Sequence, residues 1–141
     1  MTWKTDFDEK IDNILKSEIG PHRSGPADAV YNLLLDAFPH NRVGQEHFCW
    51  YKDTRLFFDF HIKELNLLFE VQGQQHYSFI EHFHGDQRGF IESKKRDNFK
   101  REYCQENNWT LVEIKYNEIP ETADDLLEII NRALEESSAA N

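Results

Sequence analysis

The sequence is poor in cysteine and has no long apolar run, and both absences exclude classes of protein. Its two cysteines, Cys49 and Cys104, do not form a Cys-x-x-Cys pair, so a structural zinc site has little support. No apolar stretch approaches the roughly 20 residues that cross a bilayer, and residues 1–6 lack the apolar core of a signal peptide. We therefore expect a cytoplasmic protein without membrane contact, in which both cysteines are small buried hydrophobic residues.

The chain also lacks a basic excess, since its formal net charge is −10 at pH 7. This charge argues against a passive nucleic-acid binder. The charges are unevenly distributed, however. Residues 118–141 hold seven acidic side chains and one basic one, whereas residues 88–101 hold six basic side chains. The basic segment is either a solvated helix face or a phosphate contact, and the second reading requires a phosphate-handling site beside it.

The length of 141 residues, with 39% hydrophobic and 13% aromatic residues, fits one globular domain over residues 1–141. Hydrophobic spacing predicts an N-terminal helix at about 5–18, a core at about 25–118 and a C-terminal helix at about 122–136. Within the core it predicts strands at 42–51, 55–62 and 65–72, a helix at 90–107 and a strand at 109–116. A second helix begins near Pro26, and residues 78–89 are expected to form a loop. The order ααβββαβα predicts an α/β fold with a mixed sheet of about four strands flanked by helices.

Two carboxylates stand inside apolar strand segments. Asp59 lies between Phe58 and Phe60, and Glu70 follows three apolar residues in the next predicted strand. A buried carboxylate is costly unless a cation or hydrogen bonds compensate it, and a divalent metal ion is one such cation. The alternative is that each carboxylate pairs with a basic side chain or caps a turn. Because a short link joins the two strands, they can be antiparallel neighbours that bring both carboxylates to one edge of the sheet.

This pattern resembles a known family. An Asp followed, across two strands, by Glu-x-Lys is the signature of the PD-(D/E)XK nucleases, and this chain has Asp59 and then Glu70-Val71-Gln72. The longer string at residues 70–77, Glu-Val-Gln-Gly-Gln-Gln-His-Tyr, is similar to small phage and bacterial nucleases related to very-short-patch repair endonucleases. A basic helix with Lys-x-x-Tyr-Cys at residues 100–104 continues the likeness, which covers about residues 25–118.

The resemblance implies a restriction-endonuclease-like core and a Mg²⁺ or Mn²⁺ site. It assigns Asp59 and Glu70 as metal ligands, with the Val71 carbonyl as a backbone ligand. Asp28 is a weaker match to an acidic residue that completes the metal shell in some relatives. His76, just beyond a strand end, would orient the attacking water or contact the phosphate, unless it only bonds the following loop.

Gln72 departs from the family, because many members have lysine there. A neutral amide cannot supply the positive charge that stabilises the pentacovalent phosphate. The resemblance therefore directs attention to the neighbouring helix, where Lys100, Arg96 and Lys94 are candidates. Arg96 and Lys100 are four residues apart and are expected to share one helix face.

The remaining candidates concern nucleic-acid contact. Arg88, Lys94, Lys95 and Arg101 are predicted to bind the phosphate backbone. Tyr77, Phe79, Phe83 and Phe90 could stack on bases, although aromatic residues at this density more often pack a core. His82 and His84 resemble a metal pair without a third ligand, and Glu46 is either a further site residue or part of an exposed strand face.

We expect a metal-dependent endonuclease that hydrolyses phosphodiester bonds, with DNA as the partner by analogy and a homodimer as an open possibility. The alternative is a catalytically silent nuclease fold that binds nucleic acid or a protein. The missing lysine at position 72 and the acidic net charge favour this alternative, whereas the presence of both Asp59 and Glu70 favours catalysis.

Overall fold

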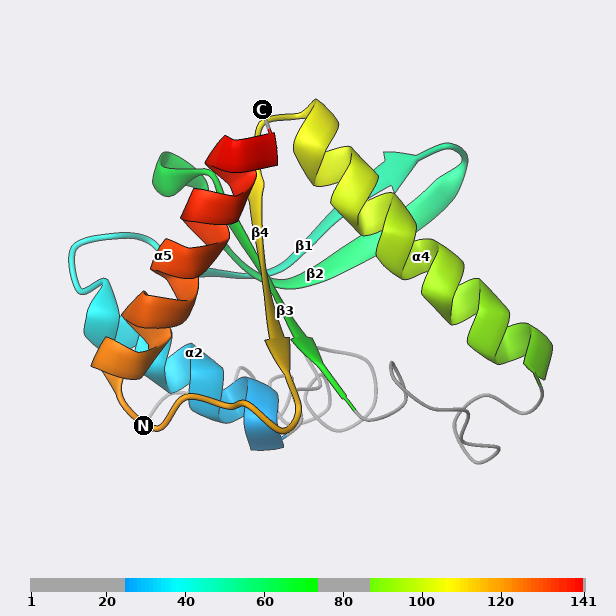
Figure 1. Cartoon of the computed structure of the whole chain (residues 1–141). Coiled ribbons are helices and arrows are strands. Elements are labelled where there is room, and N and C mark those ends of the chain that lie inside the picture. Colours follow the sequence, from blue (N-terminus) through cyan, green and yellow to red (C-terminus); the bar gives the residue numbers. More distant parts are fainter. Residues whose placement is uncertain (1–24, 74–86, 141) are drawn as a thin grey trace, which may run out of the picture.

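The computed structural model describes residues 25–73 and 87–140. Within these residues the fold has three layers, in which α2 and α5 cover one face of a sheet and α4 covers the other (Figure 1). The helices are α2 (Gly25–Ala37), α4 (Gln87–Glu106) and α5 (Ala123–Ala140). The order of the described elements confirms the predicted order from the second helix onward.

The sheet contains four strands in the order β1-β2-β3-β4, namely β1 (Gly44–Tyr51), β2 (Thr54–Ile62), β3 (Leu67–Gln72) and β4 (Thr110–Lys115). The β1–β2 and β2–β3 pairs are antiparallel, and β3–β4 is parallel. A parallel pair needs a long crossover, which α4 supplies. Lys52 and Asp53 both have positive φ, as a tight two-residue hairpin turn requires. The predicted α/β fold with a mixed four-stranded sheet is therefore confirmed.

Two apolar clusters hold the layers together. The larger, cluster 1, joins α2 and α5 to the sheet through buried residues such as Val30, Leu34, Phe69, Val112 and Leu126. The smaller, cluster 2, joins α4 to the other face of the sheet and contains the buried residues Leu56, Phe58, Leu68 and Cys104. The predicted burial of Cys104 is confirmed, whereas Cys49 is only half-buried.

Strand β2 changes the face to which it contributes at Asp59. Phe58 belongs to cluster 2, but Phe60, two residues later, belongs to cluster 1. On the neighbouring strand, Glu46 lies between the partners of Phe58 and Phe60 and has a left-handed backbone, with φ of 52°. In a regular strand, residues two apart point to the same face. Phe58 and Phe60 are both buried but on opposite faces, so the alternation is interrupted, and Asp59 lies at the interruption.

Several expected boundaries were wrong. Strand β3 starts at Leu67 because Lys63–Leu65 forms a 3-10 turn that Asn66 ends in the left-handed conformation. Helix α4 starts at Gln87, so residues 87–89 are helical and not part of the expected loop. Helix α5 continues to Ala140 where a frayed tail was expected, in line with the helix preference of alanine. The helix predicted at 5–18 lies outside the described residues.

Phe60 offers a test of this core. Its side chain is fully buried in cluster 1 and stacks on Tyr31 with ring centroids 5.4 Å apart. Phe60→Ala is expected to lower the free energy of unfolding by about 3–5 kcal/mol, because it leaves a cavity in a packed core. Phe48→Ala removes the same ring from a position that is 53% exposed and is the matched control. Equal losses for both variants in urea titrations would contradict the assigned core.

Candidate functional site

The Asp59 carboxylate lies between β2 and β3, where their backbone pairing ends. The last backbone pair toward the site is Phe60–Phe69. Beyond it, the Val71 amide donates a hydrogen bond of 2.7 Å to Asp59 Oδ2. The backbone of β2 no longer pairs with β3 at this point, and the Asp59 side chain accepts the hydrogen bond from the Val71 amide instead. This hydrogen bond holds the carboxylate beside β3.

Glu70 projects from β3 toward α4 and is 8% exposed. Its Oε1 atom lies 3.0 Å from Lys100 Nζ, which reaches down from α4. Its Oε2 atom is buried and has no hydrogen-bond partner within residues 25–73 and 87–140. One carboxylate oxygen is therefore neutralised by a lysine, and the other remains available for a further ligand.

The electrostatic environment of Glu70 is unusual for a carboxylate. Burial raises its pKa from an ordinary value of 4.5 to about 8. The positive charge of Lys100 opposes this shift, whereas the nearby negative charges of Asp59 and Asp97 add to it. The charge of Asp59 therefore acts directly on Glu70, as expected for two carboxylates that converge on one edge of the sheet.

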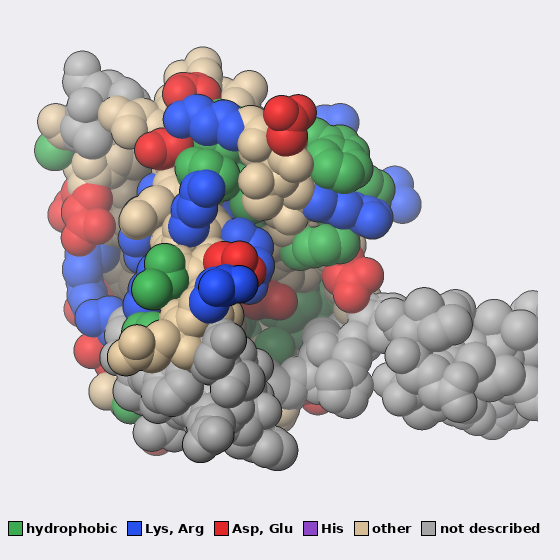
Figure 2. Space-filling view, turned by 90° about the vertical axis from the view of Figure 1, so that its right-hand side faces the viewer, with side chains coloured by type: hydrophobic (Ala, Val, Ile, Leu, Met, Phe, Trp, Pro, Cys, Tyr) green, Lys and Arg blue, Asp and Glu red, His purple; other side chains and the backbone are tan. Residues whose placement is uncertain are grey.

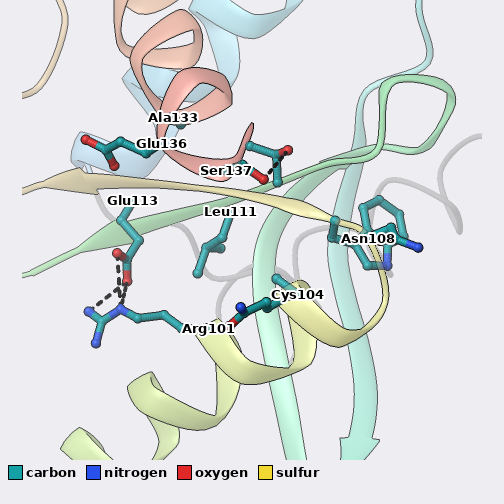
Figure 3. Close-up of a pocket in the computed structure, with 11 residues that line it drawn as sticks. Arg101, Cys104, Asn108, Leu111, Glu113, Ala133, Glu136 and Ser137 are labelled. Atoms are coloured by element: carbon teal, nitrogen blue, oxygen red, sulfur yellow. Dashed lines mark hydrogen bonds and ion pairs between the residues drawn. The ribbon is translucent and has the colours of Figure 1, made fainter. Parts of the chain in front are cut away.

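A second polar group lies beside Glu70 on β4. Glu113 is the register partner of Glu70 in the parallel β3–β4 pair. Its carboxylate accepts hydrogen bonds of 3.0 Å from Gln72 Nε2 and 3.1 Å from Arg101 Nε, and its Oε1 lies 2.9 Å from Arg101 Nη2. Figure 3 shows Arg101 and Glu113 at the wall of a cavity of about 350 Å³ between α4, β4 and α5.

The side of α4 that faces the sheet therefore carries charged residues as well as the apolar ones of cluster 2. Asp97, Lys100, Arg101 and Cys104 follow one another at helical spacing on this face. Asp97 and Cys104 are buried, Lys100 pairs with Glu70, and Arg101 pairs with Glu113. Figure 2 shows acidic and basic side chains lying together near the centre of one face of the molecule.

The predicted site residues thus fall into three groups. The structure brings together Asp59, Glu70 and Lys100, with Gln72 next to them on β3. Asp28 is exposed in the first turn of α2, on the layer that covers the opposite face of the sheet. His76, His82 and His84 lie outside the described residues, as do Tyr77, Phe79 and Phe83.

The basic residues of α4 also separate. Arg96 and Lys100 do not share an environment as expected, because Arg96 is exposed while Lys100 is turned inward. Arg88 and Lys95 are exposed, and Lys95 Nζ lies over the Phe99 ring. Lys94 Nζ lies over the Phe90 ring at 5.6 Å. Arg101 is committed to Glu113, so its predicted contact with nucleic acid would have to compete with that ion pair. Glu46 is exposed on β1.

Sequence reasoning missed Glu113 and Asp97. Glu113 stands between two buried residues, Val112 and Ile114, and such alternation usually marks an outward polar position. Because helix α4 covers that face, the position is half-buried. Asp97 lies in a strongly charged helix segment in which no hydrophobic pattern marks the inward face. The signal available was its spacing of seven residues from Cys104.

The arrangement of these carboxylates decides whether the site could hold a divalent ion. The part of the chain that the structure describes contains no group of three or more His, Cys, Asp or Glu side chains arranged to hold a metal ion. Mg²⁺ does not require such a group, since it is commonly bound by one or two carboxylates, with water and substrate phosphates as further ligands. The unpartnered Oε2 of Glu70 beside Asp59 fits that kind of site.

No protein-family model and no solved structure matches the chain. Similar proteins occur in viruses. The chain is 43% identical over 58 residues to uncharacterized protein 307L of Invertebrate iridescent virus 6, covering 41% of this chain and 29% of that protein. It is 36% identical over 59 residues to uncharacterized protein 094L of Frog virus 3 (isolate Goorha), covering 41% of this chain and 38% of that protein. The chain thus matches well under half of the length of either relative.

Membrane insertion finds no support in the described helices, none of which combines the length and apolarity that a bilayer span needs.

The pKa of Glu70 predicts a pH dependence of folding. Between pH 4.5 and about 8 the folded protein retains a proton that the unfolded chain has released, so stability falls as pH rises through this window. Glu70→Gln stays neutral and is expected to flatten this decline, which can reach a few kcal/mol. Urea titrations at about pH 5 and about pH 9 compare the two proteins. A wild-type protein that gains stability across this window relative to Glu70→Gln would contradict the assignment.

Proposed function

We propose that the chain is a metal-dependent endonuclease with a restriction-endonuclease-like core of the PD-(D/E)XK type, acting on DNA. Support comes from the spacing of Asp59 and Glu70, their convergence between β2 and β3, and the basic helix that faces them. The mixed sheet with helices on both faces is compatible with this core. A cytoplasmic location and a homodimer remain predictions of the same proposal.

One observation carries the proposal, namely the buried Oε2 of Glu70 without a partner among the described residues. A buried carboxylate oxygen without a hydrogen-bond partner lowers the free energy of unfolding, so an apolar residue at position 70 would make the protein more stable. A carboxylate held at such a cost, next to a second carboxylate, is typical of a functional site. A bound Mg²⁺ or Mn²⁺ there would supply Lewis acidity toward a phosphate oxygen and toward water.

The residues of the chain take distinct roles in this proposal. Asp59 and Glu70 would hold the ion, and the Val71 amide fixes Asp59 through its 2.7 Å hydrogen bond. Lys100 would stabilise the negative charge that develops on the phosphate, taking the role of the absent motif lysine. Gln72 is engaged by Glu113, so its contribution is to position β4 and α4 beside the site.

A specific observation also favours the alternative of a catalytically silent binding module. The Lys100 ammonium lies 3.0 Å from Glu70 and can itself neutralise the carboxylate that a metal ion would need. A cleavage screen with Mg²⁺ and Mn²⁺ over duplex, mismatched, branched and single-stranded substrates separates the two functions. Binding without cleavage of any substrate would support the silent module and contradict the nuclease.

Asp59→Ala is expected to abolish cleavage and leave the fold intact. The substitution removes a metal ligand. It also removes a negative charge that acts unfavourably on Glu70 and the acceptor of the Val71 amide, and because these two effects oppose one another the metal-free variant should melt close to wild type. Asp36→Ala, at an exposed position of α2, is the matched control and should cleave normally. Asp28→Ala, tested in parallel, decides whether α2 contributes to the metal shell. Full activity of Asp59→Ala would end the nuclease proposal at this site.

Lys100→Ala is expected to reduce the single-turnover rate at saturating protein by roughly a hundredfold or more, the scale for loss of one oriented donor. Arg96→Ala removes a cation from the preceding turn of the same helix, where it is exposed, and should retain the wild-type rate. If Lys100 only gripped a phosphate, its loss would weaken binding, and added salt would reproduce the effect. Wild-type rates for Lys100→Ala would show that the metal ion alone stabilises the charge.

A further inference from the structure

The outer half of the β1–β2 hairpin carries an aromatic surface that no described element covers. Its members are Phe48 and Trp50 on β1 and Arg55 and Phe57 on β2, which we call the outer hairpin surface. Trp50 is 67% exposed, Phe48 53% and Phe57 48%. Large aromatic side chains gathered on a solvent-exposed strand face are informative, whereas single exposed hydrophobic residues are not.

The strand alternation explains why this surface is bare. The neighbouring residues Cys49, Tyr51, Leu56 and Phe58 pack in cluster 2 beneath α4. The residues between them therefore point away from α4. On that side, α2 and α5 cover β2 only from Phe60 onward, because cluster 1 begins there. The hairpin thus extends past the two helices, and one of its faces has no described element packed against it.

The outer hairpin surface combines neighbouring aromatic rings with one positive charge. Phe48 and Phe57 are cross-strand partners with ring centroids 6.0 Å apart. The Arg55 guanidinium lies over both rings, 4.7 Å from the Phe48 centroid and 4.9 Å from the Phe57 centroid. No ion pair to Arg55 occurs among residues 25–73 and 87–140. The guanidinium is held in place by the rings, and its charge is not used inside the described protein.

We infer that this surface binds the unstacked bases of a single-stranded nucleic-acid segment, with Arg55 contacting its phosphates. Every base has a face that stacks on an aromatic ring, and an unpaired arginine complements the backbone charge. A dry protein interface would bury the Arg55 charge without a partner, which is unfavourable.

The inference rests on the proposed function, because it names the substrate class of the same site. Phe57 precedes Asp59 by two residues on β2, so a strand stacked on the hairpin would pass close to the position of Asp59. Paired duplex hides its base faces in the stack and offers nothing to these rings. The expected substrate therefore contains an unpaired stretch, such as a single strand, an end or a loop next to the cleaved bond.

Binding is tested with the full chain in EDTA, where cleavage requiring a divalent ion cannot occur. The probes are fluorescein-labelled dT and U oligonucleotides and a fully paired duplex, followed by anisotropy. Trp50→Ala and Phe57→Ala are each expected to weaken binding to the single strands by about tenfold, the scale of one lost base–ring stack. Trp50→Phe keeps a ring and should retain most of the affinity. Leu35→Ala and Leu134→Ala remove exposed apolar side chains from α2 and α5 and should have no effect.

Three other results would overturn the inference. If duplex and single strand weaken equally and Arg55→Gln alone reproduces the loss, the surface makes only phosphate contacts. If Trp50→Ala leaves binding unchanged but abolishes self-association in sedimentation, the surface joins copies of the chain. If neither aromatic variant changes binding or self-association, the surface contacts neither nucleic acid nor a second copy of the chain. Ring-dependent binding by a wild-type protein that cuts nothing in Mg²⁺ or Mn²⁺ leaves the inference standing and removes the proposed nuclease.

Discussion

The arrangement of the site depends on placing the Glu70 carboxylate between β3 and α4, away from water. A charge in that position must be compensated, and Lys100 reaches it from above at 3.0 Å. This requirement explains why the side of α4 that packs on the sheet carries charged residues beside its apolar ones. The parallel register then brings Glu113 beside Glu70, and the second carboxylate takes Arg101 as its own cation. Helix and sheet are thus joined by matched charges at Glu70 and Glu113 as well as by the apolar contacts of cluster 2.

The break in β2 serves the same end. A regular strand would send Phe58 and Phe60 to one face, and Asp59 to the other, as a solvated residue. Because the alternation changes at Asp59, both phenylalanines are buried on different faces, and the carboxylate lies toward the Val71 amide. Glu46, with its left-handed backbone opposite this position, shows that the neighbouring strand adapts too. Non-glycine residues in that conformation carry strain that other contacts must offset, as is common near functional sites.

Much of this could be predicted from the sequence where apolar period and turn chemistry agree. The hairpin at Lys52-Asp53, the apolar strand that carries Glu70, and the helix between β3 and β4 all follow from such patterns. The pairing of Lys100 and not Arg96 with Glu70 could not be predicted, since both lie on a helix without an apolar stripe to fix its rotation. The role of Glu113 was hidden because burial by α4 is a tertiary effect that alternation in one strand does not record. The bare face of the hairpin was equally hidden, because Phe48, Trp50 and Phe57 have the composition of core residues.

The unequal size of the two apolar clusters has a consequence for the dynamics of the protein. Cluster 1 holds eleven buried residues from α2, α5 and the sheet, whereas cluster 2 holds four. A layer held by the smaller buried cluster and by several ion pairs is expected to open at a lower free energy than the global unfolding of the domain. The backbone amides of α4 should accordingly exchange with solvent sooner than those of α5, and sooner still at high ionic strength, which weakens the exposed pair between Arg101 and Glu113. The layer that carries Lys100 is then the one able to lift from the sheet while the rest of the fold stays closed.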